Sequence, residues 1–478
     1  MSRHLIPPFL VALAILALPA TAIAELRAGA ATSNITPPLG GDIVGNFLPI
    51  TATHIHDELH ARCLVLDDGK TRLAIVVCDL LGLHRSVSDA ARAEIESRLS
   101  IPAENVLISA THTHSAISAL GSSRFAVEQE LDDYQTFVVT RIVDGVQRAA
   151  NLLRPAELGF GTAEAPEHVF NRRWFMHEGY TATSPYGDID QVKMNPPGGS
   201  DLLDKPAGPT DPTVSFLSVR EPDGTPISLF AAYSLHYVGG VGPGHISADY
   251  YGMFCEELTR RIAATTDDAD PLAPAFVPML ANSTSGDVNN INFSTPRPRA
   301  AAYVQMHAVA TDVAAKVHQA IARVEHSDQI ELAAAYRETP VRWRKPSPAL
   351  TAWAEEKLAE PPTESRRADL PRIYAARALA MLDHPEEAVV PLQVLRIGEV
   401  TIGTMPFEVF CEIGLEFKQR IGDSPAFLVS LAHGYFGYLP SPAQHQLGGY
   451  ETWLGTNRVQ TDASDIFLDQ LTDMAAGL

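Results

Sequence analysis

The chain has 478 residues, with 36 Lys and Arg against 57 Asp and Glu, so its formal net charge is −21. Apolar residues make up 46% and charged residues 19%, which is ordinary globular composition and excludes a disordered or coiled-coil chain. A nucleic-acid partner is disfavoured, because binding to phosphate groups requires a basic surface.

Residues 1–24 have the pattern of a cleavable signal peptide. A short basic start precedes an apolar run at residues 9–18, and Ala22-Ile23-Ala24 supplies the small residues expected before a cut. The apolar run is shorter than the ~20 residues of a membrane-spanning helix. We therefore expect a secreted or periplasmic protein whose mature chain, residues 25–478, has no integral membrane segment. The sequence does not predict an oligomeric state.

The next part of the chain alternates strand and helix patterns. Residues 59–66 and 72–78 flank an Asp-Asp-Gly-Lys turn and predict a β-hairpin. An amphipathic helix is predicted over residues 85–99, a buried strand over 105–110, and a long helix over 127–153. The strand at 105–110 runs directly into a segment rich in histidine.

Periodicity is lost between residues 165 and 213, a stretch that holds seven prolines. A long segment without secondary structure inside a compact domain is usually functional, so we expect a functional loop there. Strands at 214–220 and 227–235 follow, and a further helix is predicted over 300–324.

Residues 340–390 are charged, helical and rich in proline, and are interpreted as a helical insertion. The whole pattern predicts an α/β fold of mixed β-sheets flanked by helices, in a single large domain. Four widely spaced cysteines form no Cys-x-x-Cys pair and are expected to be buried free thiols: Cys63, Cys78, Cys255 and Cys411.

His112-Thr113-His114 is the sharpest local feature of the sequence. If the backbone is extended there, residues i and i+2 face the same side, so both imidazoles lie at the mouth of the sheet. Histidine is the commonest zinc ligand, which favours a metal site. The alternative interpretation is a pair of hydrogen-bonded core histidines.

Polar residues also follow other apolar strands. His236 precedes a glycine-rich loop, Asp287 and Asn289 follow the strand at 275–280, and Glu408 follows the strand at 400–404. A polar strand end is unremarkable alone, but several in one chain predict a common ligand-binding edge.

A second histidine cluster competes with this edge. His54, His56 and His60 alternate in the sequence and could share one face of a strand. One interpretation of this cluster is a second metal centre. The alternatives are a polar face of a strand, or residues that support the ligands of another site.

Together these residues resemble the neutral ceramidase family, exported zinc amidases that cleave the N-acyl bond of ceramide. The resemblance runs from about residue 27 to residue 456 and covers the family's catalytic domain. Its most specific block is Ser109-Ala-Thr-His-Thr-His-Ser115. Further blocks are Ala30–Pro38, Ile55-His56-Asp57 with Ala61-Arg62, Asn171-Arg172, Gly286–Asn289, Pro406-Phe-Glu408, Tyr438 and Tyr450-Glu451.

The resemblance implies one Zn²⁺ per chain and a set of site residues. Its ligands fall on His112, His236, Glu408 and Tyr438. Three further positions match residues beside the metal or around the substrate: His114, Arg172 and Tyr450. We expect the chain to consist of the catalytic domain without the family's C-terminal β-domain.

Two departures from the family pattern bear on the reaction. Asn289 stands where the family has a serine, and an asparagine cannot act as a nucleophile of that kind. Ala116-Ile117-Ser118-Ala119 replaces a glycine-rich run after the histidine block, which alters the pocket wall.

The mechanism we favour at this stage is attack by zinc-bound water on an amide of ceramide or a related N-acyl compound. Asn289 would donate a hydrogen bond to the charged intermediate, His114 would protonate the leaving amine, and Asp287 would orient a histidine or the water. One alternative is the same scaffold acting on an ester, a lactone or a short N-acyl substrate. The other is an exported binding protein without catalysis.

Overall fold

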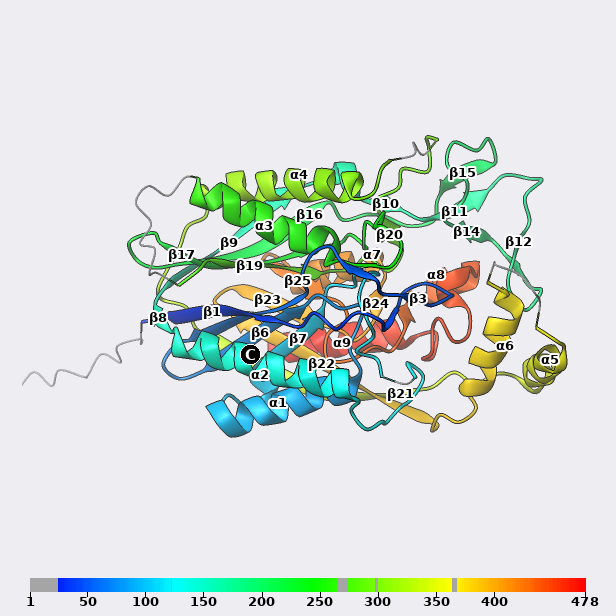
Figure 1. Ribbon diagram of the computed structural model, residues 1–478, viewed down its shortest axis with the longest axis horizontal. Helices are drawn as coiled ribbons and strands as arrows, with labels where there is room; N and C mark the ends of the chain where they lie inside the picture. The colour runs from blue at the N-terminus through cyan, green and yellow to red at the C-terminus, as the bar shows by residue number, and fades with distance from the viewer. Residues whose placement is uncertain (1–24, 122, 265–273, 297–299, 363–367) are drawn as a thin grey trace, which may run out of the picture.

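The computed structural model describes residues 25–121, 123–264, 274–296, 300–362 and 368–478. The predicted signal peptide, residues 1–24, lies outside the described residues. Three larger mixed β-sheets form the centre of the molecule, and helices cover their outer faces (Figure 1). This arrangement confirms the predicted α/β fold.

The first sheet has the strand order β7-β6-β5-β1-β8, in which only β6 and β7 are parallel. Asp68 accepts hydrogen bonds from Lys70 N and Thr71 N and so closes the predicted hairpin between β5 and β6. The strands are β1 (Arg27–Asn34), β5 (His60–Asp67), β6 (Arg72–Cys78), β7 (Val106–Ala110) and β8 (Arg154–Pro155).

Helices α1 (Arg85–Leu99) and α2 (Asp133–Asn151) cover one face of this sheet. The first has the predicted bounds. The second begins six residues later than predicted, because Asp132 and Gln135 form a capping box that fixes its start.

The second sheet has the order β19-β17-β16-β9, with β17 and β19 parallel. Helices α3 (Asp249–Ala263) and α4 (Val304–Ile321) cover its outer face. Its strands are β9 (Glu157–Glu164), β16 (Thr213–Arg220), β17 (Pro226–Tyr233) and β19 (Val277–Asn282).

The third sheet has the order β21-β22-β23-β25, with β23 and β25 parallel. Helices α7 (Cys411–Ile421) and α9 (Ala463–Ala476) pack against it. Its strands are β21 (Leu332–Arg342), β22 (Glu387–Ile397), β23 (Val400–Thr404) and β25 (Ala426–Val429).

The inner faces of the three sheets share one apolar core. Ile75 comes from the first sheet, Phe230 from the second and Phe427 from the third, and all three are almost completely buried. The rings of Phe230 and Phe427 lie 6.1 Å apart between centroids. This packing fixes the sheets relative to one another and therefore fixes the loops at their ends.

The segment 165–213 differs from its prediction. It carries short strands rather than a structureless loop: β10 (Phe170–Asn171), β11 (Arg173–Met176), β12 (Ala182–Thr183), β13 (Ile189–Asp190), β14 (Val192–Met194) and β15 (Leu203–Pro206). These strands are too short to show a hydrophobic period, and they form by pairing with other short segments. For example, β10 pairs with the distant β20 (Val288–Asn289).

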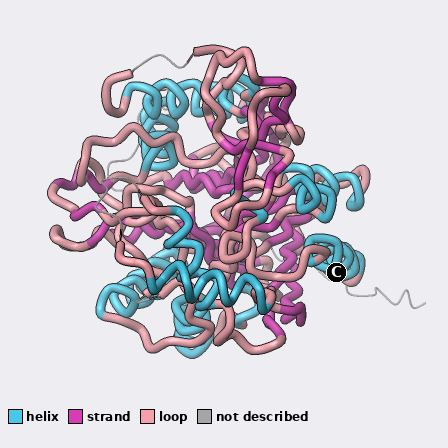
Figure 2. The backbone as a smooth tube through the Cα atoms, turned by 90° about the vertical axis from the view of Figure 1, so that its right-hand side faces the viewer, coloured by secondary structure: helices cyan, strands magenta, loops and turns pink. Residues whose placement is uncertain are grey.

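Residues 340–390 hold two helices between the paired strands β21 and β22. These are α5 (Pro348–Ala359) and α6 (Leu370–Ala380), which pack together at one end of the molecule (Figure 1). Figure 2 views the molecule from that end. All four cysteines are buried and free, as predicted. Among the residues that the structure describes, we find no helix with both the length and the apolar character needed to cross a membrane.

Candidate functional site

The carboxyl ends of strands from all three sheets meet at one edge. Asn282, at the end of β19, donates its side-chain amide to the carbonyl of Thr111, which follows β7, at 3.2 Å. Its own carbonyl accepts from Ser430 N, just after β25, at 2.9 Å. The polar strand ends that the sequence singled out are therefore held side by side.

Two imidazoles at this edge are oriented by backbone carbonyl groups. His112 Nδ1 lies 2.6 Å from Leu81 O, and His236 Nδ1 lies 3.1 Å from Ser285 O. A carbonyl oxygen can only accept, so each Nδ1 carries the hydrogen and each Nε2 is left with a lone pair. This arrangement is typical of histidines that bind a metal through Nε2.

His112 and His114 meet in a different way from the one expected. An extended backbone would place both rings on one side of a strand, but His112 has φ = 76° and lies beyond the end of β7. A non-glycine residue in this left-handed region is strained, and such strain clusters at functional sites. The turn brings His114 Nε2 to 3.2 Å from His112 Nε2.

Glu408 supplies a carboxylate to the same place. It lies on β24 (Glu408–Val409), which pairs in parallel with β26 (Tyr438–Leu439), so that Glu408 and Tyr438 are direct neighbours in register. Its Oε2 atom is 3.1 Å from His112 Nε2 and 3.6 Å from His236 Nε2. Its Oε1 atom accepts a hydrogen bond of 2.8 Å from the hydroxyl of Tyr435.

The donor atoms have the chemistry of a zinc site. Ligand atoms of His112, His114 and His236 all lie within 4.8 Å of one another. Glu408 Oε2 is buried and has no hydrogen-bond partner among the described residues. Lone pairs of imidazoles and of a carboxylate oxygen repel one another when no proton lies between them. A cation placed among them stabilises the arrangement, and Zn²⁺ prefers these ligand types.

Protonation states agree with this fit. The pKa values of His114 and His236 are well below the ordinary value, mainly because the rings are buried and secondly because of the neighbouring His112. Both rings are therefore neutral at pH 7. Burial alone would raise the pKa of Glu408, but His112, Tyr438 and Arg172 together hold it below its ordinary value. The cluster thus presents neutral imidazoles and a charged carboxylate.

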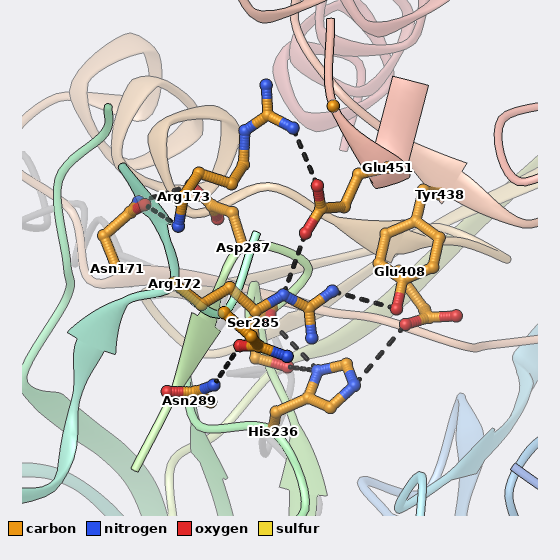
Figure 3. A network of polar contacts seen from close by, with 12 residues as sticks. Asn171, Arg172, Arg173, His236, Ser285, Asp287, Asn289, Glu408, Tyr438 and Glu451 are labelled. Carbon is orange, nitrogen blue, oxygen red and sulfur yellow. Dashed lines mark hydrogen bonds and ion pairs between the residues drawn. The ribbon is translucent and has the colours of Figure 1, made fainter. Parts of the chain in front are cut away.

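Tyr438 lies beside Glu408 in register and is also bonded by an arginine. Arg172 donates from Nη2 to the Tyr438 hydroxyl oxygen at 3.0 Å and from Nε to Glu451 Oε1 at 2.9 Å (Figure 3). Glu451, which is fully buried, also accepts from Arg173 at 2.7 Å. Burial raises the pKa of Tyr438 well above its ordinary value, and Arg172 opposes this shift only in part. The phenolate form that a metal ligand requires therefore needs the charge of a bound cation. Tyr450 packs edge-to-face on Tyr438, with ring centroids 5.6 Å apart.

Asn289 and Asp287 are engaged in holding neighbouring segments. Asn289 donates from Nδ2 to Asn195 Oδ1 at 3.0 Å, and its own Oδ1 accepts from Ile291 N. The carboxylate of Asp287 accepts from Cys411 N at 2.8 Å and from Asn171 Nδ2 at 2.7 Å (Figure 3). Asp287 therefore joins β10 to the start of α7, and the catalytic roles of both residues stay predictions.

The competing histidines do not gather around a common point. His54 faces His245, with ring centroids 4.5 Å apart, whereas His56 bonds to Asp57 at 2.7 Å. Where the structure describes the chain, these residues do not form a group with converging ligand atoms.

Within the described ranges, one other group of converging ligand atoms occurs, and it lies at the surface. It consists of Glu167, His168 and Asp312, and Lys316 forms ion pairs with both of its carboxylates. The lysine already supplies the positive charge that those carboxylates need.

Several contributing residues were missed in the sequence analysis. Leu81 and Ser285 act through backbone carbonyls, which no residue type reveals. Tyr435 lies in the segment before Tyr438 and bonds to Glu408, and Tyr237 stacks on His114 at 3.6 Å between ring centroids. Their aromatic character beside predicted ligands was the available signal.

A cavity of about 790 Å³ borders the cluster. Gly45 in its wall lies against the ring of His114, and Leu81 in its wall is the residue that holds His112. Most of the lining is apolar, including Ile43, Phe47, Ile117, Leu120 and Phe125.

Comparisons with known proteins agree with this geometry. A family profile described as neutral/alkaline non-lysosomal ceramidase, N-terminal, matches residues 29–300, more than half of the chain. A solved structure described as a ceramidase complexed with C2 superposes with a TM-score of 0.69 at 18% identity, covering 95% of this chain and 75% of that one. The crystal structure of neutral ceramidase from Pseudomonas aeruginosa gives 0.67 at 18% identity, with 95% and 74% covered. At such identities the two structures show a shared fold.

Proposed function

Because the chain belongs to the neutral/alkaline non-lysosomal ceramidase family, we propose that it is a zinc-dependent hydrolase that cleaves an N-acyl amide bond, in ceramide or a related N-acyl compound. The observation that carries the proposal is the convergence of His112 Nε2, His236 Nε2 and the unpartnered Glu408 Oε2 at the edge shared by three sheets. We also propose that the mature chain begins after residue 24, is exported, and forms one catalytic domain.

His112, His236, Glu408 and Tyr438 would hold the zinc ion. When bound, zinc supplies Lewis acidity, which polarises a carbonyl and makes water a stronger nucleophile at neutral pH. Arg172 keeps Tyr438 in place through the hydrogen bond to its hydroxyl and stays charged against Glu451. Tyr435 fixes Glu408 so that its free oxygen faces the two histidines.

His114 would move the proton that the leaving amine needs. Its ring is clamped between Tyr237 and Gly45, and its Nε2 atom points toward the cluster. Burial keeps this ring neutral, so His114 would first take up a proton at Nε2 from the attacking water and then release it readily to the leaving nitrogen. Asn289 would offer an amide N–H to negative charge that develops on the substrate oxygen, a contribution of roughly 3 kcal/mol in comparable sites.

Hydrolysis of N-dodecanoylsphingosine by the purified protein tests this proposal. We expect release of dodecanoate that is lost on treatment with a chelator and restored by Zn²⁺. His236→Ala should abolish the activity, while His326→Ala, whose ring contacts Ser218 on β16, should retain it. A protein that cleaves neither this amide nor short N-acyl amines, esters or lactones when loaded with zinc would contradict catalysis and favour a binding protein.

A further inference from the structure

The cavity beside the zinc cluster contains arginines without carboxylate partners. Arg124 and Arg377 both line it, and neither forms an ion pair in the described part of the chain. Arg377 is only 7% exposed, and within the described part of the chain its guanidinium makes one long hydrogen bond, of 3.4 Å, to the hydroxyl of Thr456. Its guanidinium otherwise lies over the rings of Tyr374 and Phe47, at 4.7 and 5.6 Å.

A third arginine, also without an ion pair among the described residues, contacts the wall that carries Arg124. Arg458 is 3% exposed, donates to the carbonyl of Arg124 at 2.5 Å and packs over Phe125, which lines the cavity. Its Nε atom has no hydrogen-bond partner among the described residues. Burial lowers the pKa of Arg458 to about 9. Attraction by Tyr435 opposes this shift, and repulsion from Arg124 and Arg377 adds to it.

Such a grouping is unusual in this chain, whose net charge is −21. Buried arginines are normally paired, because removing a guanidinium from water without a counter-ion is costly. Two carboxylates, Asp42 and Asp132, also line the cavity, but both are exposed and neither is paired with an arginine. Asp132 caps helix α2 instead, through Gln135 N. The arginines therefore present an uncompensated positive charge.

The cavity reaches the proposed reaction site. Gly45 in its wall touches His114, and Phe47 at its rim packs edge-to-face on Tyr450 at 6.1 Å between ring centroids. Its walls combine this positive charge with an apolar surface formed by Ile43, Ile117 and Leu120. A ligand that matches both features is an amphiphile with an alkyl chain and an anionic group, and arginine is the side chain best suited to hold a carboxylate or a sulfonate.

We propose that the preferred substrate is an N-acyl compound whose amine half carries an acidic group, such as a carboxylate, held by Arg124 and Arg377, with Arg458 against the wall that carries Arg124. This inference rests on the proposed amidase function and specifies its substrate class. For N-dodecanoylglycine, water adds across the C–N bond: its oxygen joins the acyl carbon, a proton goes to the nitrogen, and dodecanoate and glycine are released.

The test compares N-dodecanoylglycine with N-dodecanoylethanolamine, which has the same chain length and a neutral amine half. We expect kcat/KM of the zinc-loaded protein to be at least tenfold higher for the acidic substrate. Arg377→Gln and Arg124→Gln should each raise KM for that substrate about tenfold and change KM for the neutral one less than twofold. Arg220→Gln, which removes an arginine already paired with Glu157, should change neither.

Binding to the chelator-treated protein, measured by calorimetry, separates this inference from the proposed function. Tighter binding of the acidic compound that Arg377→Gln abolishes supports the inference, even if no amide is cleaved. Equal binding and equal turnover of the two compounds overturn the inference about the acidic group. The proposed amidase function still stands in that case, because both amides are cleaved. A third result would be that the enzyme shows no preference between the two substrates, while dodecanoate inhibits the wild type more strongly than Arg377→Gln. The arginines would then bind the fatty-acid product, and the inference would be overturned. Arg124, which is more exposed than Arg377, provides the second variant if Arg377→Gln does not fold.

Discussion

At the scale of single residues, the site depends on hydrogen bonds that orient its ligands. A group that is not itself a ligand orients each predicted ligand: Leu81 for His112, Ser285 for His236, Tyr435 for Glu408 and Arg172 for Tyr438. Outer contacts of this kind tune metal affinity even though they never touch the metal.

Tyr435→Phe tests this idea with the loss of one oxygen atom. Removing the donor to Glu408 Oε1 should weaken zinc binding by roughly tenfold or more, because the carboxylate is then less firmly oriented. Competition with a chromophoric chelator measures the affinity. Tyr336→Phe is the matched control, since that hydroxyl bonds to none of the cluster residues. Equal affinities in the two variants would contradict the role of Tyr435.

Asp249 makes a separate prediction about stability and pH. Its carboxylate accepts from Val238 N and Gly239 N and so fixes the loop after His236, and burial raises its pKa to about 6 from an ordinary 3.8. The folded protein therefore binds this proton more tightly than the unfolded chain, so the group's contribution to stability falls as pH rises from about 4 to 6 and is constant above that.

Asp249→Asn should remove this pH dependence. Between pH 4.5 and pH 7, the free energy of unfolding of the wild type should fall relative to the variant by about 2 kcal/mol. Urea unfolding at the two pH values measures the change. A difference between the proteins that does not vary with pH would show that Asp249 titrates normally in the folded state.

At the scale of elements, the loop between β1 and β4 (His54–Ile55) brings main chain against the cluster. Gly45 has φ = 107°, and a Cβ atom there would lie 2.5 Å from His114 Nδ1. Gly40 in the same loop has φ = 98° but open space around it. Both glycines therefore need a positive φ, but only Gly45 lies against His114.

Gly45→Ala should displace His114 and lower amidase activity by roughly tenfold or more, since small misplacements of a catalytic group are costly. Gly40→Ala should carry a similar conformational cost of about 1 kcal/mol without the loss of activity. Steady-state kinetics and thermal unfolding of both variants separate the two effects. Comparable activities would mean that the approach of Gly45 has no bearing on His114.

The sequence predicted regular elements well and long-range pairings poorly. Helix α1 and strand β6 have the predicted bounds, because hydrophobic periodicity is a local property. The pairing of β10 with β20 joins residues more than a hundred positions apart, and no local pattern carries that information. The left-handed backbone of His112 escaped prediction for the same reason, since tertiary contacts impose it.

At the scale of the whole molecule, the proposed ligands come from different sheets. His112 follows a strand of the first sheet, His236 one of the second and Glu408 one of the third. The candidate residues of the family pattern therefore come together only because the three sheets share a core. The sequence supported this set through the resemblance, whereas the arginines around the cavity needed the folded structure to be noticed.

A metal that joins three sheets should stabilise the entire fold. Zinc at about a thousand times its dissociation constant would add about 4 kcal/mol to the free energy of unfolding, so chelation should lower the thermal midpoint by several degrees. Differential scanning calorimetry measures this shift. Glu408→Gln should show a much smaller response to the chelator, and an equal response would place the stabilising metal elsewhere.

The central claim is that side chains from three sheets bind one zinc ion. Zinc content of the purified wild type and of His236→Ala, measured by plasma mass spectrometry after dialysis, tests it most directly. We expect about one zinc ion per wild-type chain and little in the variant. A wild type without zinc, or a variant that keeps the same amount, would contradict it.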